Sequence, residues 1–277
     1  MLNAAGAKKS TSHGAVCRKA KRPHFLWHLL PYALLLAACY SVFTVAADDP
    51  FITYRYAANL LAGHGAVYNI GERVEGFSSP LHLLLCALLL RIAPAIDILF
   101  KAKLLGIAFA ALAIYQTRRL GWLARLKPWE IFLAQSLVAL NINFALAAVN
   151  GIETTLYVCV VAATAEAFTR ECRGRGGIGS ALWLALALAT RPETLLLFPA
   201  LLIARLLWIR RRHMPLRGVF AWGLLFIWIA ALMTLARLAY YGAPLPNTYY
   251  AKDVPLSRGF YEGYWYLARP FWPTVLD

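Results

Sequence analysis

The chain has 277 residues, of which 61% are hydrophobic and only 15% are charged. Soluble domains carry about a quarter charged residues, so one soluble core cannot bury this composition. Apolar runs of membrane-spanning length recur, and a span needs roughly 20 apolar residues. In such a chain the net charge of +15 reports orientation rather than nucleic-acid binding, because what matters is where the Lys and Arg residues lie. The sequence predicts an all-α, multi-pass membrane protein with no nucleic-acid partner.

Basic residues divide the sequence into inner and outer segments. Residues 1–24 form a basic tail before the apolar run 25–47, so the positive-inside rule places the N-terminus in the cytoplasm and Asp48 outside. On this map the whole excess of +15 falls on the inner side. Further inner turns are marked by basic clusters at 118–127, 170–175 and 205–217.

One short apolar segment decides how many times the chain crosses. Residues 80–93 are short for a span and contain Arg91. They therefore predict an interfacial or re-entrant helix, and residues 48–97 become one outer loop. Within that loop, an amphipathic helix is predicted over 50–62. The expected organisation is the tail 1–24, a transmembrane module over 25–240 and an outer segment over 241–277. About seven spans are predicted, at 25–47, 98–117, 131–149, 154–169, 179–190, 194–210 and 218–240.

Two adjacent aspartates, Asp48 and Asp49, follow the first apolar run. Aspartate is a good helix cap before Pro50, which suits a first helical turn. One carboxylate is enough for the cap, and a second beside it at a membrane boundary is costly, so the pair is a candidate functional site. One could act as a general base toward an incoming hydroxyl while the other orients it or holds a divalent cation. No cysteine spacing typical of a metal site occurs.

Other outward charges gather at predicted span ends. Glu75 lies between turn residues, and Glu153 opens a helix; a solvated loop acid and a helix-dipole partner are the alternatives. The motif 190–193 interrupts an apolar stretch, which indicates that it lines a cavity or reaches the interface; Arg191 there is a candidate phosphate ligand beside Glu193. A lip rich in Pro and Tyr over 240–252 could grip a sugar or a lipid. Weaker candidates are Arg55, Lys101, Lys103, Tyr249 and Lys252.

Taken in order, these motifs resemble the bacterial GT-C glycosyltransferases, and in particular the group of the terminal β-(1→2) arabinofuranosyltransferase. The resemblance covers about residues 25–255. It implies a polyprenyl-phosphate sugar donor, an acidic catalytic residue at Asp48 or Asp49, and a donor cavity in or near which Glu75, Glu153 and Arg191 lie. Family members continue with further spans and an outer C-terminal domain, whereas this sequence ends at Asp277. The motifs are Asp48-Asp49-Pro50 through Tyr56, Gly63-His64-Gly65, Val74 through Pro80, Asn150 through Thr154, Thr190 through Glu193, and the lip over 241–252.

The resulting prediction is a glycosyltransferase of the bacterial inner membrane whose active site faces the periplasm. It moves a sugar, for example a pentose such as arabinose, from the lipid donor to a cell-envelope glycan such as lipopolysaccharide or to another acceptor hydroxyl, a protein acceptor included. Membrane lipid is the other expected partner. Two alternatives stay open: a lipid or solute transporter or flippase, and a non-catalytic subunit that presents lipid. Carriers tend to hold binding charges near mid-membrane between repeated halves, whereas this sequence shows no repeat.

Overall fold

A computed structural model describes residues 26–174, 177–212, 216–250 and Tyr261. Within those ranges the chain is built from helices and their connections, as the sequence predicts, with no β-strand. The helices are α1 (Leu26–Ser41), α2 (Asp49–Leu61), α3 (Pro80–Ile92), α4 (Ile98–Leu123), α5 (Pro128–Ala139), α6 (Ile142–Val149), α7 (Thr154–Cys172), α8 (Gly179–Leu188), the 3-10 helix η1 (Pro192–Leu196), α9 (Leu197–Arg212), α10 (Arg217–Tyr241) and α11 (Asn247–Tyr250).

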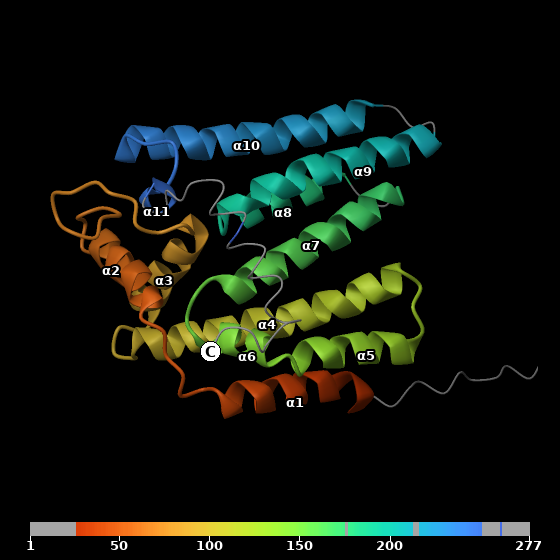
Figure 1. The fold of residues 1–277 in the computed structure, drawn as a ribbon, viewed down its shortest axis with the longest axis horizontal. Coiled ribbons are helices and arrows are strands. Elements are labelled where there is room, and N and C mark those ends of the chain that lie inside the picture. The colour runs from red at the N-terminus through yellow and green to blue at the C-terminus, as the bar shows by residue number, and fades with distance from the viewer. Residues whose placement is uncertain (1–25, 175–176, 213–215, 251–260, 262–277) are drawn as a thin grey trace, which may run out of the picture.

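The long helices lie side by side, so their connections collect at two opposite ends (Figure 1). One end holds the C-terminal ends of α4, α7 and α9 and the start of α5, and the described residues of the basic clusters predicted to be inner lie toward this end. The other end holds the α2–α3 hairpin and the α6–α7 connection. This grouping agrees with a two-sided arrangement. The compartment that each end faces stays a prediction.

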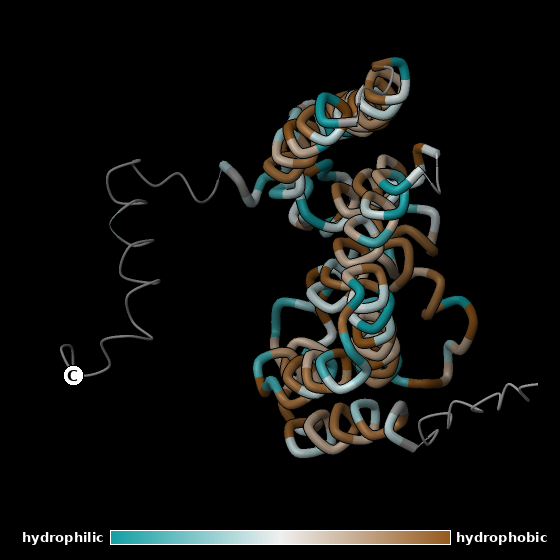
Figure 2. The backbone as a smooth tube through the Cα atoms, turned by 90° about the vertical axis from the view of Figure 1, so that its right-hand side faces the viewer, coloured by the Kyte–Doolittle hydropathy of each residue, from teal (hydrophilic) through white to brown (hydrophobic). Residues whose placement is uncertain are grey.

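Three helical stretches of the described chain are long and apolar enough to cross a membrane: α4, η1 with α9, and α10. The bent pair of α5 and α6 makes a fourth if it counts as one span. The predicted spans at 25–47 and 179–190 correspond to the shorter helices α1 and α8. Hydrophobic residues run along every long helix (Figure 2). These apolar helices fit a membrane protein, and the seven-span arrangement stays a prediction.

The predicted span 131–149 is broken into α5 and α6, which meet at an angle of 58°. Asn141 caps α6 by accepting a hydrogen bond from the backbone N–H of Phe144 at 3.1 Å. An N-cap side chain of this kind starts a new helix because it satisfies a donor that no intrahelical acceptor reaches. The bend brings α6 close to α4, where Gly106 packs directly against the backbone of Ala148.

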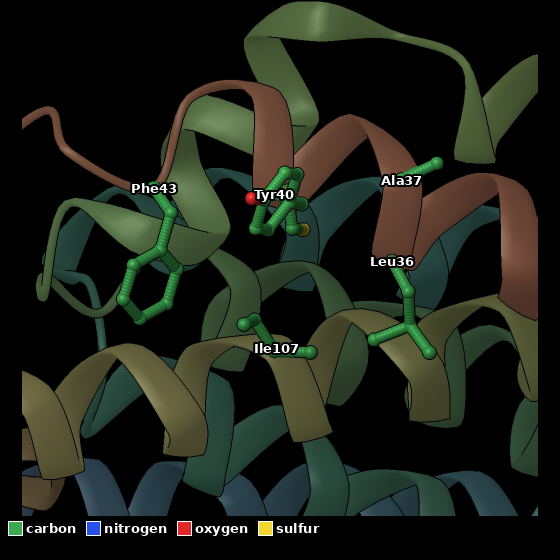
Figure 3. A pocket seen from close by; sticks show the side chains of 6 residues that line it. Leu36, Ala37, Tyr40, Phe43 and Ile107 are labelled. Atoms are coloured by element: carbon green, nitrogen blue, oxygen red, sulfur yellow. The ribbon is translucent and has the colours of Figure 1, made fainter.

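The first predicted span ends earlier than expected, because α1 stops at Ser41 and residues 45–47 are not helical. Lys103 of α4 donates hydrogen bonds to the carbonyl oxygens of Phe43 and Val45, at 2.6 and 2.8 Å. An ammonium group therefore satisfies carbonyls that have left the helix. An apolar groove of about 470 Å³ lies beside this point, between α1 and α4, and Phe43, Tyr40 and Ile107 line it (Figure 3).

At the end that carries the basic clusters, a buried polar network joins α7, α8, α9 and α10. Arg205 pairs with Glu171 at 2.6 Å, and the same carboxylate accepts hydrogen bonds from the backbone and hydroxyl of Ser180. Trp222 donates its indole N–H to that hydroxyl at 2.8 Å. Each member has a partner, which is the condition under which buried charges are tolerated.

Candidate functional site

The aspartate pair lies at the start of α2, at the end of the bundle opposite the basic clusters (Figure 1). Asp48 is the N-cap, and its carboxylate accepts a hydrogen bond from the backbone N–H of Asp49 at 3.0 Å. Both side chains are exposed, whereas Pro50 behind them is buried. The predicted cap is therefore confirmed for one aspartate. Among the described residues no group donates a hydrogen bond to the Asp49 carboxylate.

The α6–α7 connection is held against α2 and α3 through one backbone carbonyl. Tyr54 donates its phenol hydroxyl to the carbonyl oxygen of Gly151 at 3.0 Å, and the ring nitrogen Nε2 of His82 lies 3.2 Å from the same oxygen. A Cβ built on Gly151 would lie 3.6 Å from Cβ of Pro50, so this connection packs beside the aspartate pair. The buried contacts place the motif 150–154 next to the N-terminus of α2.

Glu153 and Arg191, two predicted site residues 38 positions apart, form an ion pair at this end of the bundle. Nη2 and Nε of Arg191 lie 3.0 and 3.1 Å from one carboxylate oxygen of Glu153. Nη2 also donates to the hydroxyl of Thr154 at 3.2 Å. The glutamate side chain is 14% exposed and the arginine side chain 33% exposed, so the guanidinium is held in place yet reachable from outside.

The Glu153–Arg191 pair also interacts electrostatically with His82 of α3. Burial lowers the pKa of His82, and the Glu153 carboxylate and the hydrogen bond with Gly151 oppose that shift. The imidazole is 4% exposed, so it belongs to the packing behind the ion pair. The backbone N–H of Leu81 donates to the carbonyl of Ala189 at 2.9 Å, which also fixes α3 beside the motif 190–193.

The structure gives Glu75 a partner that the sequence analysis missed. Nε of Arg237, on α10, lies 2.6 Å from the Glu75 carboxylate, and both side chains are largely buried. Burial raises the pKa of Glu75, and the Arg237 guanidinium opposes that shift. The signal was available, because Arg237 is a charge within the last apolar run, and a charge in such a run is by default paired or functional.

The remaining predicted residues do not join either pair. Lys101 and Lys103 lie on α4 and donate to backbone carbonyls, Lys101 to Leu89 and Ala93 at 2.8 and 2.6 Å. Arg55 is exposed and makes a long hydrogen bond, 3.4 Å, to the carbonyl of Tyr68. Glu193 is exposed in the first turn of η1. Tyr249 lies in α11 without a described side chain, and Lys252 falls outside the described residues.

In the described part of the chain, no three His, Cys, Asp or Glu side chains come together as a metal site would require. The Asp48–Asp49 pair supplies two carboxylates, and hard divalent cations prefer oxygen ligands. A divalent cation at this pair stays a prediction.

The fold and the site define an all-helical protein with three or four candidate membrane spans and a cluster of charged residues at one end of its helices. Comparison with protein-family models, with curated proteins and with solved structures finds no match to this chain.

Proposed function

We propose that this chain is a membrane glycosyltransferase that uses a polyprenyl-phosphate sugar donor. The observation that carries the proposal is the convergence of three separate sequence motifs at one end of the helices. Pro50, beside the aspartate pair, packs against Gly151, and the same connection carries Glu153 to its ion pair with Arg191. The site thus combines an exposed carboxylate pair with a reachable cation, which suits transfer from an anionic lipid donor.

In the proposed reaction, an acceptor hydroxyl attacks the anomeric carbon of the donor sugar. The hydroxyl proton passes to an aspartate carboxylate as the new glycosidic bond forms, and the bond from the anomeric carbon to the phosphate oxygen breaks. The phosphate leaves on its lipid and needs no strong acid. Direct displacement of this kind inverts the anomeric centre. Hydrogen bonding favours Asp49 as the base, because Asp48 already caps α2.

Arg191 is the proposed phosphate ligand. Arginine suits phosphate because its planar guanidinium presents several donors in a fixed geometry. Glu153 holds the guanidinium by its Nε and Nη2 edge, which positions it before the donor arrives and limits the ordering cost of binding. The transferred sugar is proposed to be a pentose such as arabinose. The acceptor belongs to the bacterial cell envelope, and transfer takes place on the periplasmic side of the inner membrane.

The proposal is tested with Asp48→Asn and Asp49→Asn in membranes supplied with lipid-linked sugar. Loss of a general base lowers turnover by about 10²–10⁴-fold, and we expect that loss for Asp49→Asn. Asparagine caps a helix as well as aspartate does, so neither change should unfold α2.

Asp97→Asn is the matched control, because Asp97 is also an exposed N-cap, on α4, and it accepts from Phe100 at 2.9 Å. Full turnover in both Asp48 and Asp49 variants would contradict the catalytic assignment. Movement of labelled substrate across the membrane without covalent transfer would indicate a transporter instead. Loss of turnover with a chelator, restored by a divalent cation, would show that the reaction needs a metal.

A further inference from the structure

A groove of about 370 Å³ lies between α10 and the α2–α3 hairpin. Its walls are mainly apolar: Leu60 and Pro80 come from the hairpin side, and Met233 and Ala236 from α10. The Glu75–Arg237 ion pair contributes the charge among its lining residues. This volume lies in the range of sites that bind small molecules.

The polarity of the groove changes along α10. Met233 comes first, Arg237 follows one helical turn later, and Tyr240 lies at the end of the helix. At a rise of about 1.5 Å per residue, the guanidinium is carried about 6 Å farther along the helix than Met233. An apolar floor, a cation and a phenol hydroxyl thus follow one another toward the helix end. That order matches an amphiphile whose tail lies along the helix and whose head lies at its end.

Arg237 has N–H donors that could bind the anionic headgroup of a lipid. Its Nε is paired with Glu75 at 2.6 Å, and its Nη1 makes only a long contact, 3.4 Å, with the carbonyl of Pro244. Across the described chain, Nη2 of this residue donates no hydrogen bond. Arginine with free donors in an apolar groove favours phosphate, whose oxygens accept from two nitrogens at once.

The helix that carries Arg237 also presents an apolar face to its surroundings. Leu232, Leu235 and Leu238 are each about half exposed, at 52%, 60% and 46%. In a membrane span such a face lies against lipid tails. These leucines lie on roughly the opposite side of α10 from the groove residues Met233, Ala236 and Arg237, so in a membrane span the groove is walled by a helix whose outer face borders lipid.

We propose that the groove between α10 and the α2–α3 hairpin binds one anionic phospholipid of the surrounding membrane, with its phosphate on Arg237 and its tail along Met233 and Leu60. This site differs from the Asp49–Arg191 cluster, and the proposal does not depend on sugar transfer. Glu75 competes with the phosphate for the guanidinium, and so sets the strength of binding.

The test is native mass spectrometry of the purified chain in a neutral detergent. The probes are phosphatidylglycerol, phosphatidylcholine with the same acyl chains, and inorganic phosphate. We expect phosphatidylglycerol to bind about tenfold more tightly than phosphatidylcholine, which corresponds to about 1.4 kcal/mol. Inorganic phosphate alone should give no adduct at the same concentration. Equal binding of the two lipids, or a phosphate adduct as strong as the lipid adduct, would overturn the proposal.

Two variants locate the site. Arg237→Gln should reduce phosphatidylglycerol binding to the level of phosphatidylcholine, whereas Glu75→Gln should increase it, because the guanidinium loses its competitor. A purely structural ion pair would not strengthen lipid binding when its acid is removed. The double Glu75→Gln, Arg237→Gln variant avoids a buried unpaired charge and should behave like Arg237→Gln. Arg191→Gln is the control. Loss of phosphatidylglycerol binding in this variant, with binding unchanged in Arg237→Gln, would indicate that the lipid binds at the Asp49–Arg191 cluster instead.

Discussion

Gly151→Ala tests the contact that joins the aspartate pair to the Glu153–Arg191 pair. Gly151 has a φ of +82°, and a new Cβ would lie 2.5 Å from the hydroxyl of Tyr54. The left-handed conformation costs an alanine about 1–2 kcal/mol. Displacing a buried hydroxyl from its hydrogen bond costs about 1–3 kcal/mol more. We therefore expect a loss of about 2–5 kcal/mol in the free energy of unfolding.

Gly63→Ala is the matched control, because Gly63 has a φ of +83° and no described heavy atom lies within 4 Å of a built Cβ. Its free energy of unfolding should fall only by the cost of the left-handed conformation, about 1–2 kcal/mol. Tryptophan fluorescence during denaturation in mixed detergent micelles measures both variants. Adding Tyr54→Phe to Gly151→Ala should recover part of the loss, since the clashing hydroxyl is gone. Equal losses for the two alanine variants would refute the packing argument.

Three further predictions concern other parts of the chain. Gly106→Ala should destabilise the protein by at least about 1–3 kcal/mol, because its Cβ would collide with the backbone of Ala148; the same unfolding assay checks this. Arg205→Met should cost about 3–5 kcal/mol by leaving Glu171 buried without its cation. A double Arg205→Met, Glu171→Gln variant should recover part of that stability, because the glutamine side chain is neutral and its oxygen can still accept a hydrogen bond from Ser180. Burial raises the pKa of Glu75 above its ordinary 4.5, so the folded protein holds this proton more tightly than the unfolded chain. Unfolding free energy from this group should fall as pH rises from 4.5 through the raised folded value, and a pH series on Glu75→Gln should lack that slope.

Local signals predicted the α2–α3 hairpin well. The expected helix 50–62 is observed over Asp49–Leu61, and the expected interfacial segment 80–93 is the helix Pro80–Ile92. Both begin with a cap and a proline in the first turn, and such features act within a few residues. The break within the predicted span 131–149 also had a local signal in Asn141, which the apolar composition around it concealed.

Contacts between residues far apart in the sequence could not be predicted from local signals. Glu75 and Arg237 are 162 positions apart, and nothing near either residue specifies the other. Just beyond the early end of α1, the carbonyl oxygen of Phe43 accepts a hydrogen bond from Lys103, which lies 60 positions farther along the chain. The site was predicted as a set of outward charges. Its division into a Glu153–Arg191 pair and a separate Glu75–Arg237 pair needed the packing of helices.

The two lysines of α4 have a geometric consequence for the aspartate pair. Lys101 and Lys103 differ by two positions, or about 200° around a helix, so they reach out on nearly opposite sides. One holds the end of α3 and the other holds the segment that leads into Asp48. The spacing between those two anchors is then set by the diameter of a single helix, about 10 Å. Because both anchors are side chains of α4, a rotation of this helix about its axis would displace α3 and the segment before Asp48 in opposite directions, and so would change the distance between them.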